Sequence, residues 1–189
     1  IQNNMGRGIS GCDGLIRYNT VTDNSEGGLA DCNGTVELNV ITDNTAGYGG
    51  GLRGCSGTIR ANTIARNIVV GNSVHGGGID SCSGIIEHNL LMENSAQKGG
   101  AIGHSHGTIR NNIITANSAG TGSAFHYCNA VIENNTIYGN LGTGAAACMN
   151  DCRGIIRNCI IWNNTDDGQP GLYECTIPYY CCVEGWSAG

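Results

Sequence analysis

Apolar and polar positions repeat along the whole chain with a period of 20 to 27 residues. Each copy has apolar residues three positions before, four after and nine after a cysteine, and asparagines seven and twelve after it. Such a period indicates a repeat array, in which each unit buries its apolar positions against its neighbours. With the cysteine as origin there are eight units, the last one degenerate, and in one unit serine replaces the cysteine. The anchors are Cys12, Cys32, Cys55, Cys82, Ser105, Cys128, Cys152 and Cys175.

The repeat predicts strands rather than helices. A helical solenoid needs apolar residues at i, i+3, i+4 and i+7 over ten or more residues, and no unit has them. Each unit instead has three short apolar spots, β-branched residues, and glycine or asparagine at fixed offsets, as strands and turns require. We therefore predict an all-β fold, a right-handed parallel β-helix of about eight coils. Each coil would have three short strands, and the coils would stack about 4.8 Å apart.

The three apolar positions predict three ladders that point into the interior. Their members are Ile9, Leu29, Leu52, Ile79, Ile102, Phe125, Met149 and Leu172; Ile16, Val36, Ile59, Ile86, Ile109, Ile132, Ile156 and Tyr179; and Val21, Ile41, Ile64, Leu91, Ile114, Ile137 and Ile161. Beside the second ladder lies an outward row of alternating charge: Arg17, Glu37, Arg60, Glu87, Arg110, Glu133 and Arg157. Cross-strand pairs of opposite sign stabilise one register, because a slip by one coil would juxtapose like charges.

The asparagines form two further rows, which we place at corners of the coil. Asparagine tolerates left-handed backbone angles, and stacked amides bond one another between coils. One row holds Asn19, Asn39, Asn62, Asn89, Asn112 and Asn135, and the other holds Asn24, Asn44, Asn67, Asn94, Asn117, Asn140 and Asn164. We expect both rows to be structural.

Seven of the eleven cysteines occupy one position of the repeat. We predict that they stack as buried free thiols, which pack as small apolar residues. Disulfides stay open as an alternative, since a spacing of about 4.8 Å lies within the range of their Cα separations. Cys159 and Cys182 replace asparagine at one corner of adjacent coils and are the best disulfide candidates. No cysteine and histidine spacing matches a zinc cluster.

Composition indicates a single domain over residues 1–189. Charged residues make up 13% and the net charge is only -6, with no cluster of lysine and arginine, so nucleic-acid binding is not expected. No apolar run approaches the roughly 20 residues of a membrane span. Because Asn4 occupies a repeat position, we expect the chain to be a piece of a longer protein without its end caps. Uncapped strand edges predict end-to-end self-association.

Several motifs resemble a known superfamily. The starts GGGL, GGGI and GGAI (49–52, 76–79 and 99–102) and the centres GTIRxN and GIIExN are similar to the right-handed parallel β-helix repeat, or pectin-lyase-like, superfamily. Its members include polysaccharide lyases, glycoside hydrolases, epimerases and adhesin-like surface proteins. Segments 158–170 and 178–186 resemble the end of the repeat array in large secreted bacterial proteins of mostly unassigned function. The resemblance implies an extracellular or cell-surface location.

The catalytic motifs of that superfamily do not carry over. Hydrolases of the polygalacturonase type combine an NTD, a DD and a later HG with a basic element, and here Asp166-Asp167 stands without the others. Lyases of this fold need clustered calcium-binding acids and a basic residue on long loops. The one long insertion, at 68–75, is largely apolar. The resemblance therefore implies the fold and not an activity.

The repeat is irregular beside the cysteine row, and we call the residues there the irregular strip: Arg53, Asp80, His104, His106, His126, Tyr127, Asn129, Asp151 and Arg153. Acids, imidazoles, guanidinium and aromatic groups together are typical of sites that bind or cleave sugars. In the resembled superfamily, substrate grooves usually lie on this face. His104 and His126, on neighbouring coils, are the expected acid and base of any catalysis. Asp80 and Asp151 are three coils apart, about 14 Å, beyond the roughly 5 to 9.5 Å of paired glycosidase carboxylates.

We therefore predict an extracellular β-helix module with a structural or carbohydrate-binding role and without a required cofactor. The alternative is a polysaccharide lyase or glycoside hydrolase that acts on an acidic polysaccharide through the strip of coils four to seven. Calcium is a weaker expectation, because Asp23 and Asp43 share an outward position but two carboxylates do not fill a coordination shell. Ice binding would need a flat threonine array, and Ala65, Met92, Tyr138 and Trp162 interrupt the row of Thr22, Thr42 and Thr115.

Overall fold

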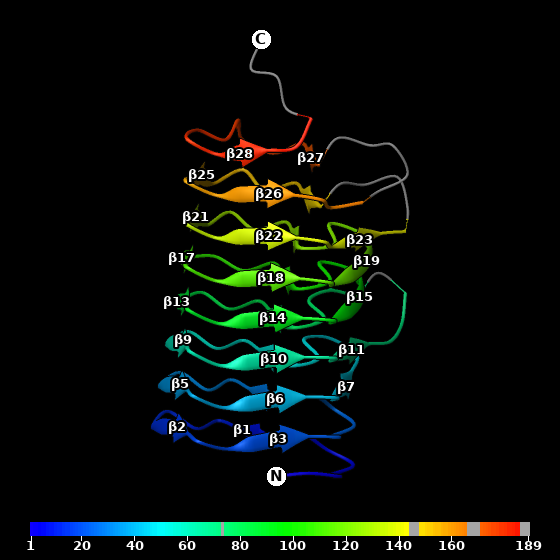
Figure 1. Cartoon of the computed structure of the whole chain (residues 1–189). Helices are drawn as coiled ribbons and strands as arrows, with labels where there is room; N and C mark the ends of the chain where they lie inside the picture. Colours follow the sequence, from blue (N-terminus) through cyan, green and yellow to red (C-terminus); the bar gives the residue numbers. More distant parts are fainter. Residues whose placement is uncertain (73, 144–147, 166–170, 186–189) are drawn as a thin grey trace.

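The repeat units are the coils of one solenoid in a computed structural model of the chain, and the coils stack in the order of the sequence (Figure 1). The structure describes residues 1–72, 74–143, 148–165 and 171–185. All regular elements in these ranges are strands, which confirms the all-β prediction. No helix long and apolar enough to cross a membrane occurs within the described residues.

Most coils contribute one strand to each of three parallel sheets. Sheet 1 contains β1 (Ile9–Ser10), β4 (Leu29–Ala30), β8 (Leu52–Arg53), β12 (Ile79–Asp80), β16 (Ile102–Gly103), β20 (Phe125–His126), β24 (Met149–Asn150) and β27 (Leu172–Tyr173). Sheet 2 contains β2 (Leu15–Arg17), β5 (Thr35–Glu37), β9 (Thr58–Arg60), β13 (Ile85–Glu87), β17 (Thr108–Arg110), β21 (Val131–Glu133) and β25 (Ile155–Arg157). Sheet 3 contains β3 (Thr20–Thr22), β6 (Val40–Thr42), β10 (Thr63–Ala65), β14 (Leu90–Met92), β18 (Ile113–Thr115), β22 (Thr136–Tyr138), β26 (Ile160–Trp162) and β28 (Cys182–Val183).

The three apolar ladders fill the interior as predicted. In the fourth coil, Ile79, Ile86 and Leu91 come from sheets 1, 2 and 3 and are completely buried. Burial of such side chains is the main stabilising contribution, worth roughly 1.5 to 3 kcal/mol for each. The prediction is wrong for Tyr179, which is 41% exposed and pairs with Arg157 instead of continuing the ladder of Ile156. The last coil is shortened there, so its residues reach the corners one position earlier than in the preceding units.

Both asparagine rows form the predicted hydrogen-bonded ladders. The Asn94 amide donates to Asn117 Oδ1 of the next coil and to the carbonyl of Ile64 in the preceding coil. Its own Oδ1 accepts bonds from the backbone and side-chain N–H groups of Asn67. The expected left-handed angle, however, lies one residue earlier, for example at Glu93 with φ 56°. The bend is therefore made by the preceding residue, and the asparagine bonds the groups that the bend leaves unpaired.

The cysteine row is the ladder of a third corner. The residue before each cysteine has a left-handed φ, as at Ser81 with φ 53°. The Cys82 thiol donates to the carbonyl of Asp80 and accepts the Cys55 backbone N–H, and the Ser105 hydroxyl bonds equivalently to Gly103 and Cys82. Five of the row are buried and Cys12 and Cys175 are partly buried, so the prediction of stacked thiols is confirmed. Packing is not their only contribution, because six of these thiols also donate to the backbone carbonyl two residues earlier.

The predicted partner of Cys159 is wrong. The backbone N–H of Cys159 donates to Cys181 Sγ at 3.3 Å, so Cys181 continues this corner ladder. Cys182 pairs with Ile160 in sheet 3 and is exposed. The shortened last coil explains the shift, since 22 residues instead of 23 separate the two corner positions. Cys159, Cys181 and Cys182 are all free thiols.

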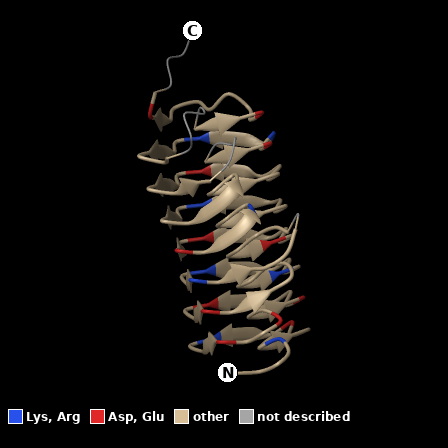
Figure 2. Cartoon of the chain, turned by 90° about the vertical axis from the view of Figure 1, so that its right-hand side faces the viewer, with Lys and Arg blue, Asp and Glu red and all other residues tan. Residues whose placement is uncertain are grey.

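The charged row lies on the outer face of sheet 2, where basic and acidic strands alternate up the stack (Figure 2). Glu37 pairs with both Arg17 and Arg60, Arg110 with Glu87 at 2.8 Å, and Arg157 with Glu133. The register of the strands places every charge opposite its counterion on the neighbouring coil, for example Glu87 opposite Arg110. The predicted charge ladder is confirmed.

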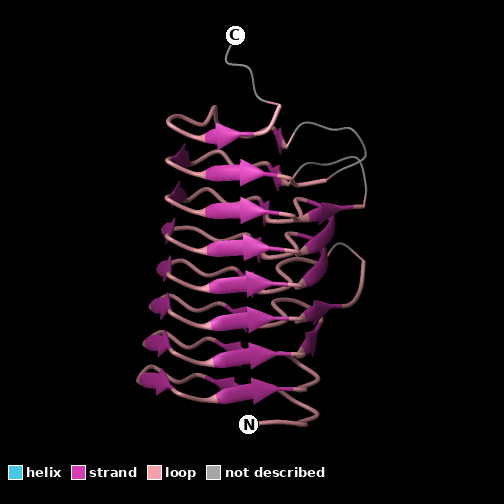
Figure 3. Cartoon of the chain, in the orientation of Figure 1, coloured by secondary structure: helices cyan, strands magenta, loops and turns pink. Residues whose placement is uncertain are grey.

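A fourth, shorter sheet was not expected (Figure 3). It contains β7 (Thr45–Ala46), β11 (Ile68–Val69), β15 (Ser95–Lys98), β19 (Ser118–Thr121) and β23 (Leu141–Gly142), which follow the second asparagine corner in five coils. The apolar insertion at 68–75 begins with β11, and its Val69 and Val74 pack with Ala96 in a small second core. The insertion ends at His75, directly beside sheet 1, and so enters the site described next.

Candidate functional site

In each middle coil, a glycine with a left-handed backbone angle turns the chain from the fourth sheet, sheet 4, toward sheet 1. Gly76 has φ 66°, and a Cβ on it would lie 2.5 Å from the Cβ of Asp80. Only glycine permits both this angle and this close approach. The turn therefore brings the side chain that precedes the glycine, His75, against the outward residues of β12 and its neighbours.

Gly103 leaves a gap in the outward row of sheet 1. This row pairs Asp80 with Gly103 and Gly103 with His126 on successive coils. A Cβ at Gly103 would lie 2.8 Å from Gly76 N and 3.2 Å from both Asp80 Oδ1 and His75 Cβ. Because no side chain occupies this position, groups from the coils on either side meet above it.

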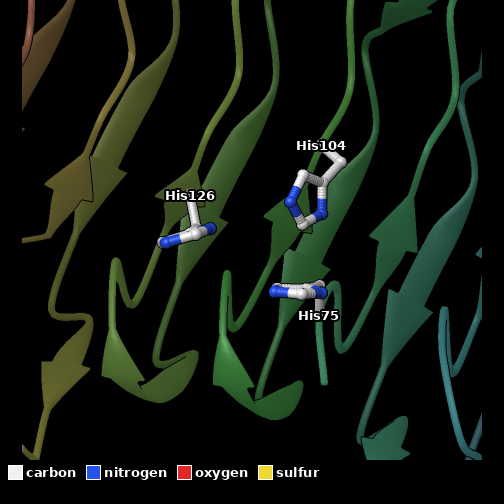
Figure 4. Close-up of side chains that lie close together, drawn as sticks. All are labelled: His75, His104 and His126. Carbon is white, nitrogen blue, oxygen red and sulfur yellow. The ribbon is translucent and has the colours of Figure 1, made fainter. Parts of the chain in front are cut away.

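Three imidazoles gather over this gap, and we call His75, His104 and His126 the histidine cluster (Figure 4). One nitrogen from each ring lies within 4.8 Å of the others. The ring centroids of His75 and His104 are 4.0 Å apart in an edge-to-face arrangement, and those of His75 and His126 are 5.6 Å apart. The three residues belong to three successive repeat units, on a wall held by the corner ladders.

Burial keeps two of the imidazoles neutral. Desolvation, with a smaller effect of the other imidazoles and of Lys98, lowers the pKa of His75 and of His126 to about 4. Both rings are therefore uncharged at neutral pH, and each has one nitrogen with a free lone pair. His126 Nδ1 is buried and has no hydrogen-bond partner within the part of the chain that the structure describes.

Asp80 lies beneath the cluster and is only 3% exposed. Burial raises the pKa of its carboxyl, and the Ser81 hydroxyl and His104 oppose that shift. Its Oδ2 accepts a bond from Ser81, whereas Oδ1 lies 3.5 Å from His104 Nδ1 and has no hydrogen-bond partner among the described residues. Two buried polar atoms at one place, Asp80 Oδ1 and His126 Nδ1, thus have unused bonding capacity.

Two exposed tyrosines flank the cluster. Tyr48 stacks beside His75 with ring centroids 6.3 Å apart, and the Arg53 guanidinium lies 5.3 Å from the Tyr48 ring. Tyr127 lies on the other side, 5.4 Å from the ring of His104. Tyr48 is 46% exposed and Tyr127 43%. The site thus combines neutral imidazoles and a buried carboxylate with an aromatic rim.

The structure brings together only part of the irregular strip. Asp80, His104, His126 and Tyr127 meet around the gap, and Arg53 joins them through Tyr48. His106 is exposed and is not part of the cluster.

The other strip residues form a separate polar group toward the C-terminal end. Asn129 Oδ1 accepts the backbone N–H of Arg153, whose side chain pairs with Asp151 at 2.6 Å and with Glu174 at 3.4 Å. Asp151 is thus paired with arginine and not with Asp80. Asp166 and Asp167 lie outside the described residues.

The calcium prediction concerns a different corner. Both carboxylate oxygens of Asp43 accept bonds from Arg66 at 2.8 Å, which lowers the pKa of Asp43. Asp23 accepts a bond from the Thr22 hydroxyl. A calcium ion between the two aspartates would have to displace Arg66, so the structure adds no support to this prediction.

Sequence reasoning missed His75, because the residue lies outside the positions compared near each cysteine. A signal was present seven residues before the cysteine, where Tyr48, His75, Lys98 and Thr121 align, each followed by glycine. All four of these glycines have positive φ angles. Outward residues that precede such a glycine are brought back to sheet 1, and this rule would have placed His75 at the strip.

Comparison with known proteins gives one match. A family model described as "Right handed beta helix region" matches residues 51–177, which is two thirds of the chain. No curated protein matches the chain, and no solved structure does either.

Proposed function

The chain belongs to the right-handed β-helix family, and we propose that it is a binding module that presents its irregular strip to a polysaccharide or surface glycan outside the cell. The fold itself supports a structural or binding module. The observation that carries the finer proposal is the pair of exposed tyrosines, Tyr48 and Tyr127, on either side of a polar patch.

The chemistry of the rim suits a sugar chain. Aromatic faces pack against the C–H face of a pyranose ring, and the polar groups between them exchange hydrogen bonds with hydroxyls. The Arg53 guanidinium, 5.3 Å from the Tyr48 ring, offers hydrogen-bond donors beside that face. The backbone beside both tyrosines is hydrogen-bonded to the next coil, from Gly49 to His75 and from Tyr127 to Asn150, so little backbone entropy is lost on binding.

The geometry favours binding over the lyase or hydrolase alternative. The two strip carboxylates do not face one another, since Asp151 is paired with Arg153 and Asp80 is buried beneath the histidine cluster. His126, the expected acid or base, has a pKa of about 4, far from the value near 7 that general catalysis at neutral pH requires.

An extracellular location is part of the proposal and is compatible with the many thiols. Thiolates, not thiols, are oxidised readily. Burial raises the pKa of Cys159 to about 12 and that of Cys152 well above its ordinary value. These two buried thiols are thereby protected in an oxidising medium.

Native affinity electrophoresis through gels that contain acidic or neutral polysaccharides tests the proposal, with EDTA present so that metal ions have no effect. We expect at least one glycan to retard the wild type, and Tyr48→Ala with Tyr127→Ala to abolish the retardation. Tyr18→Ala is the control, because Tyr18 is also exposed, at 69%, and also lies under an arginine, Arg17, but belongs to a distant corner. Equal mobility of all proteins on every glycan would refute the proposal.

A further inference from the structure

We propose that His75, His104 and His126 bind one divalent transition-metal ion of the zinc type, with a coordination position left open to solvent. This site is independent of the glycan proposal. The geometry of the cluster is the first argument. Three ligand nitrogens at about 2.0 to 2.1 Å from a tetrahedral ion are about 3.3 Å apart. The cluster nitrogens already lie within 4.8 Å of one another. Side-chain rotations that move these nitrogens by about 1 Å would complete the site.

The state of the imidazoles is the second argument. A metal ion binds the neutral ring, and protonated rings in so small a space would repel one another. The ring centroids of His75 and His104 are only 4.0 Å apart, so the arrangement of the cluster itself disfavours protonated rings. His126 Nδ1 is buried and has no hydrogen-bond partner among the described residues, so this ring has unused bonding capacity.

The third argument is the carboxylate beneath the cluster. Metal-binding histidines commonly donate their second ring N–H to a carboxylate, which orients the ring and increases its basicity. Asp80 Oδ1 lies 3.5 Å from His104 Nδ1 and has no hydrogen-bond partner among the described residues. A small rotation of His104 makes that bond, and the negative charge of Asp80 offsets part of the charge of the ion.

The donor set also selects the class of ion. Imidazole favours Zn²⁺, Co²⁺, Ni²⁺ and Cu²⁺ over the hard ions Ca²⁺ and Mg²⁺. Three histidines with a solvent-facing fourth position are typical of sites in which the metal exchanges a further ligand. Lys98 acts against binding, since its charge already lowers the pKa of His75 and His126. We therefore expect Lys98→Gln to bind the ion more tightly than the wild type.

Isothermal titration with Zn²⁺ and optical titration with Co²⁺ test the site in the full chain. The cluster variants are His75→Ala, His126→Ala and His104→Asn, the last because His104 has φ 44° and asparagine tolerates that angle. His106→Ala is the matched control, an exposed histidine two residues from His104 and outside the cluster. Urea unfolding of each variant without metal shows whether the fold is retained.

We expect one ion per chain in the wild type and in His106→Ala. Asp80→Asn, which removes the carboxylate that orients His104, should weaken binding by about 10- to 100-fold. Each cluster variant removes a metal ligand itself and should weaken binding by more than that. The Co²⁺ complex should lack thiolate-to-metal charge-transfer absorption, which separates this site from the cysteines. Unchanged affinity in folded cluster variants, a thiolate band, or no saturable binding by the wild type would overturn the proposal, whatever the glycan result.

Discussion

Replacement of one buried ladder asparagine tests how the corners hold the solenoid together. Asn94 is completely buried and makes four ladder bonds, two as donor to Asn117 and Ile64 and two as acceptor from Asn67. Asn94→Ala removes all four and leaves the Asn67 backbone N–H without an acceptor. At about 1 kcal/mol net for each of three bonds, and 1 to 3 kcal/mol for the fourth, which leaves the buried N–H unpaired, we expect a loss of roughly 4 to 6 kcal/mol.

The matched control lies in the same ladder. Asn164 makes three bonds, to Asn140 and Ile137, but it is only partly buried near the last coil. Water replaces part of what Asn164→Ala removes, so we expect a loss of about 1 to 2 kcal/mol. The comparison separates the effect of burial from the effect of removing an amide.

Urea unfolding followed by circular dichroism measures both free energies of unfolding, provided that the slope of the transition is unchanged. Because a solenoid can open in parts, hydrogen exchange at coils three to five should accompany the measurement. If Asn94→Ala were no more destabilising than Asn164→Ala, the ladder bonds would not be what holds the corners, and packing alone would have to account for them.

Two further predictions concern charge. Burial raises the pKa of the Cys159 thiol from 9.0 to about 12, so its contribution to stability is complete below pH 9 and decreases as the pH rises toward 12. Between pH 8 and 10 the wild type should therefore lose about 1 kcal/mol more unfolding free energy than Cys159→Ser. Serine is chosen because Ser105 replaces a thiol at a corner in the same way. Equal losses in the two proteins would contradict this prediction. In Glu87→Lys a lysine would lie between Arg60 and Arg110, so the variant should lose about 1 kcal/mol or more of unfolding free energy, partly restored by salt. Glu26→Lys is the control and should cost little, because Glu26 is exposed and forms no ion pair with a described residue. A salt-independent loss in urea unfolding would mean that altered packing, and not charge, destabilises the variant.

The sequence predicted those features that every coil must satisfy. Inward side chains, corner asparagines and alternating charges recur because a stack of parallel strands imposes the same environment on each copy. The alignment of Ile64 with Ile41 and Leu91 is thus visible in the sequence before it is seen in sheet 3. The cysteine row was placed correctly for the same reason, although its hydrogen bonds to the corner backbone are not visible in the sequence.

The features that were missed depend on departures from the repeat. The shortened last coil pairs Cys159 with Cys181, because one residue fewer separates the corners, and a fixed period cannot register such a change. The segment between the second asparagine corner and sheet 1 varies in length from coil to coil. Its residues therefore have no fixed position in the repeat, and neither sheet 4 nor the contact of His75 with sheet 1 was predicted. In that segment, glycines with left-handed backbone angles, such as Gly76, set the path of the chain and thereby the direction of the neighbouring side chains. The sequence alone does not show this path.

The position of the histidine cluster follows from how a regular wall gains a site. Outward side chains on successive coils are about 4.8 Å apart and run parallel, so groups two coils apart do not meet while the coil between them carries a side chain. Gly103 removes that side chain between Asp80 and His126, and the glycine turn at Gly76 brings His75 over the space. In this solenoid, therefore, the candidate site arises where one coil lacks a side chain, while the ladders on the other faces keep the surrounding coils in register.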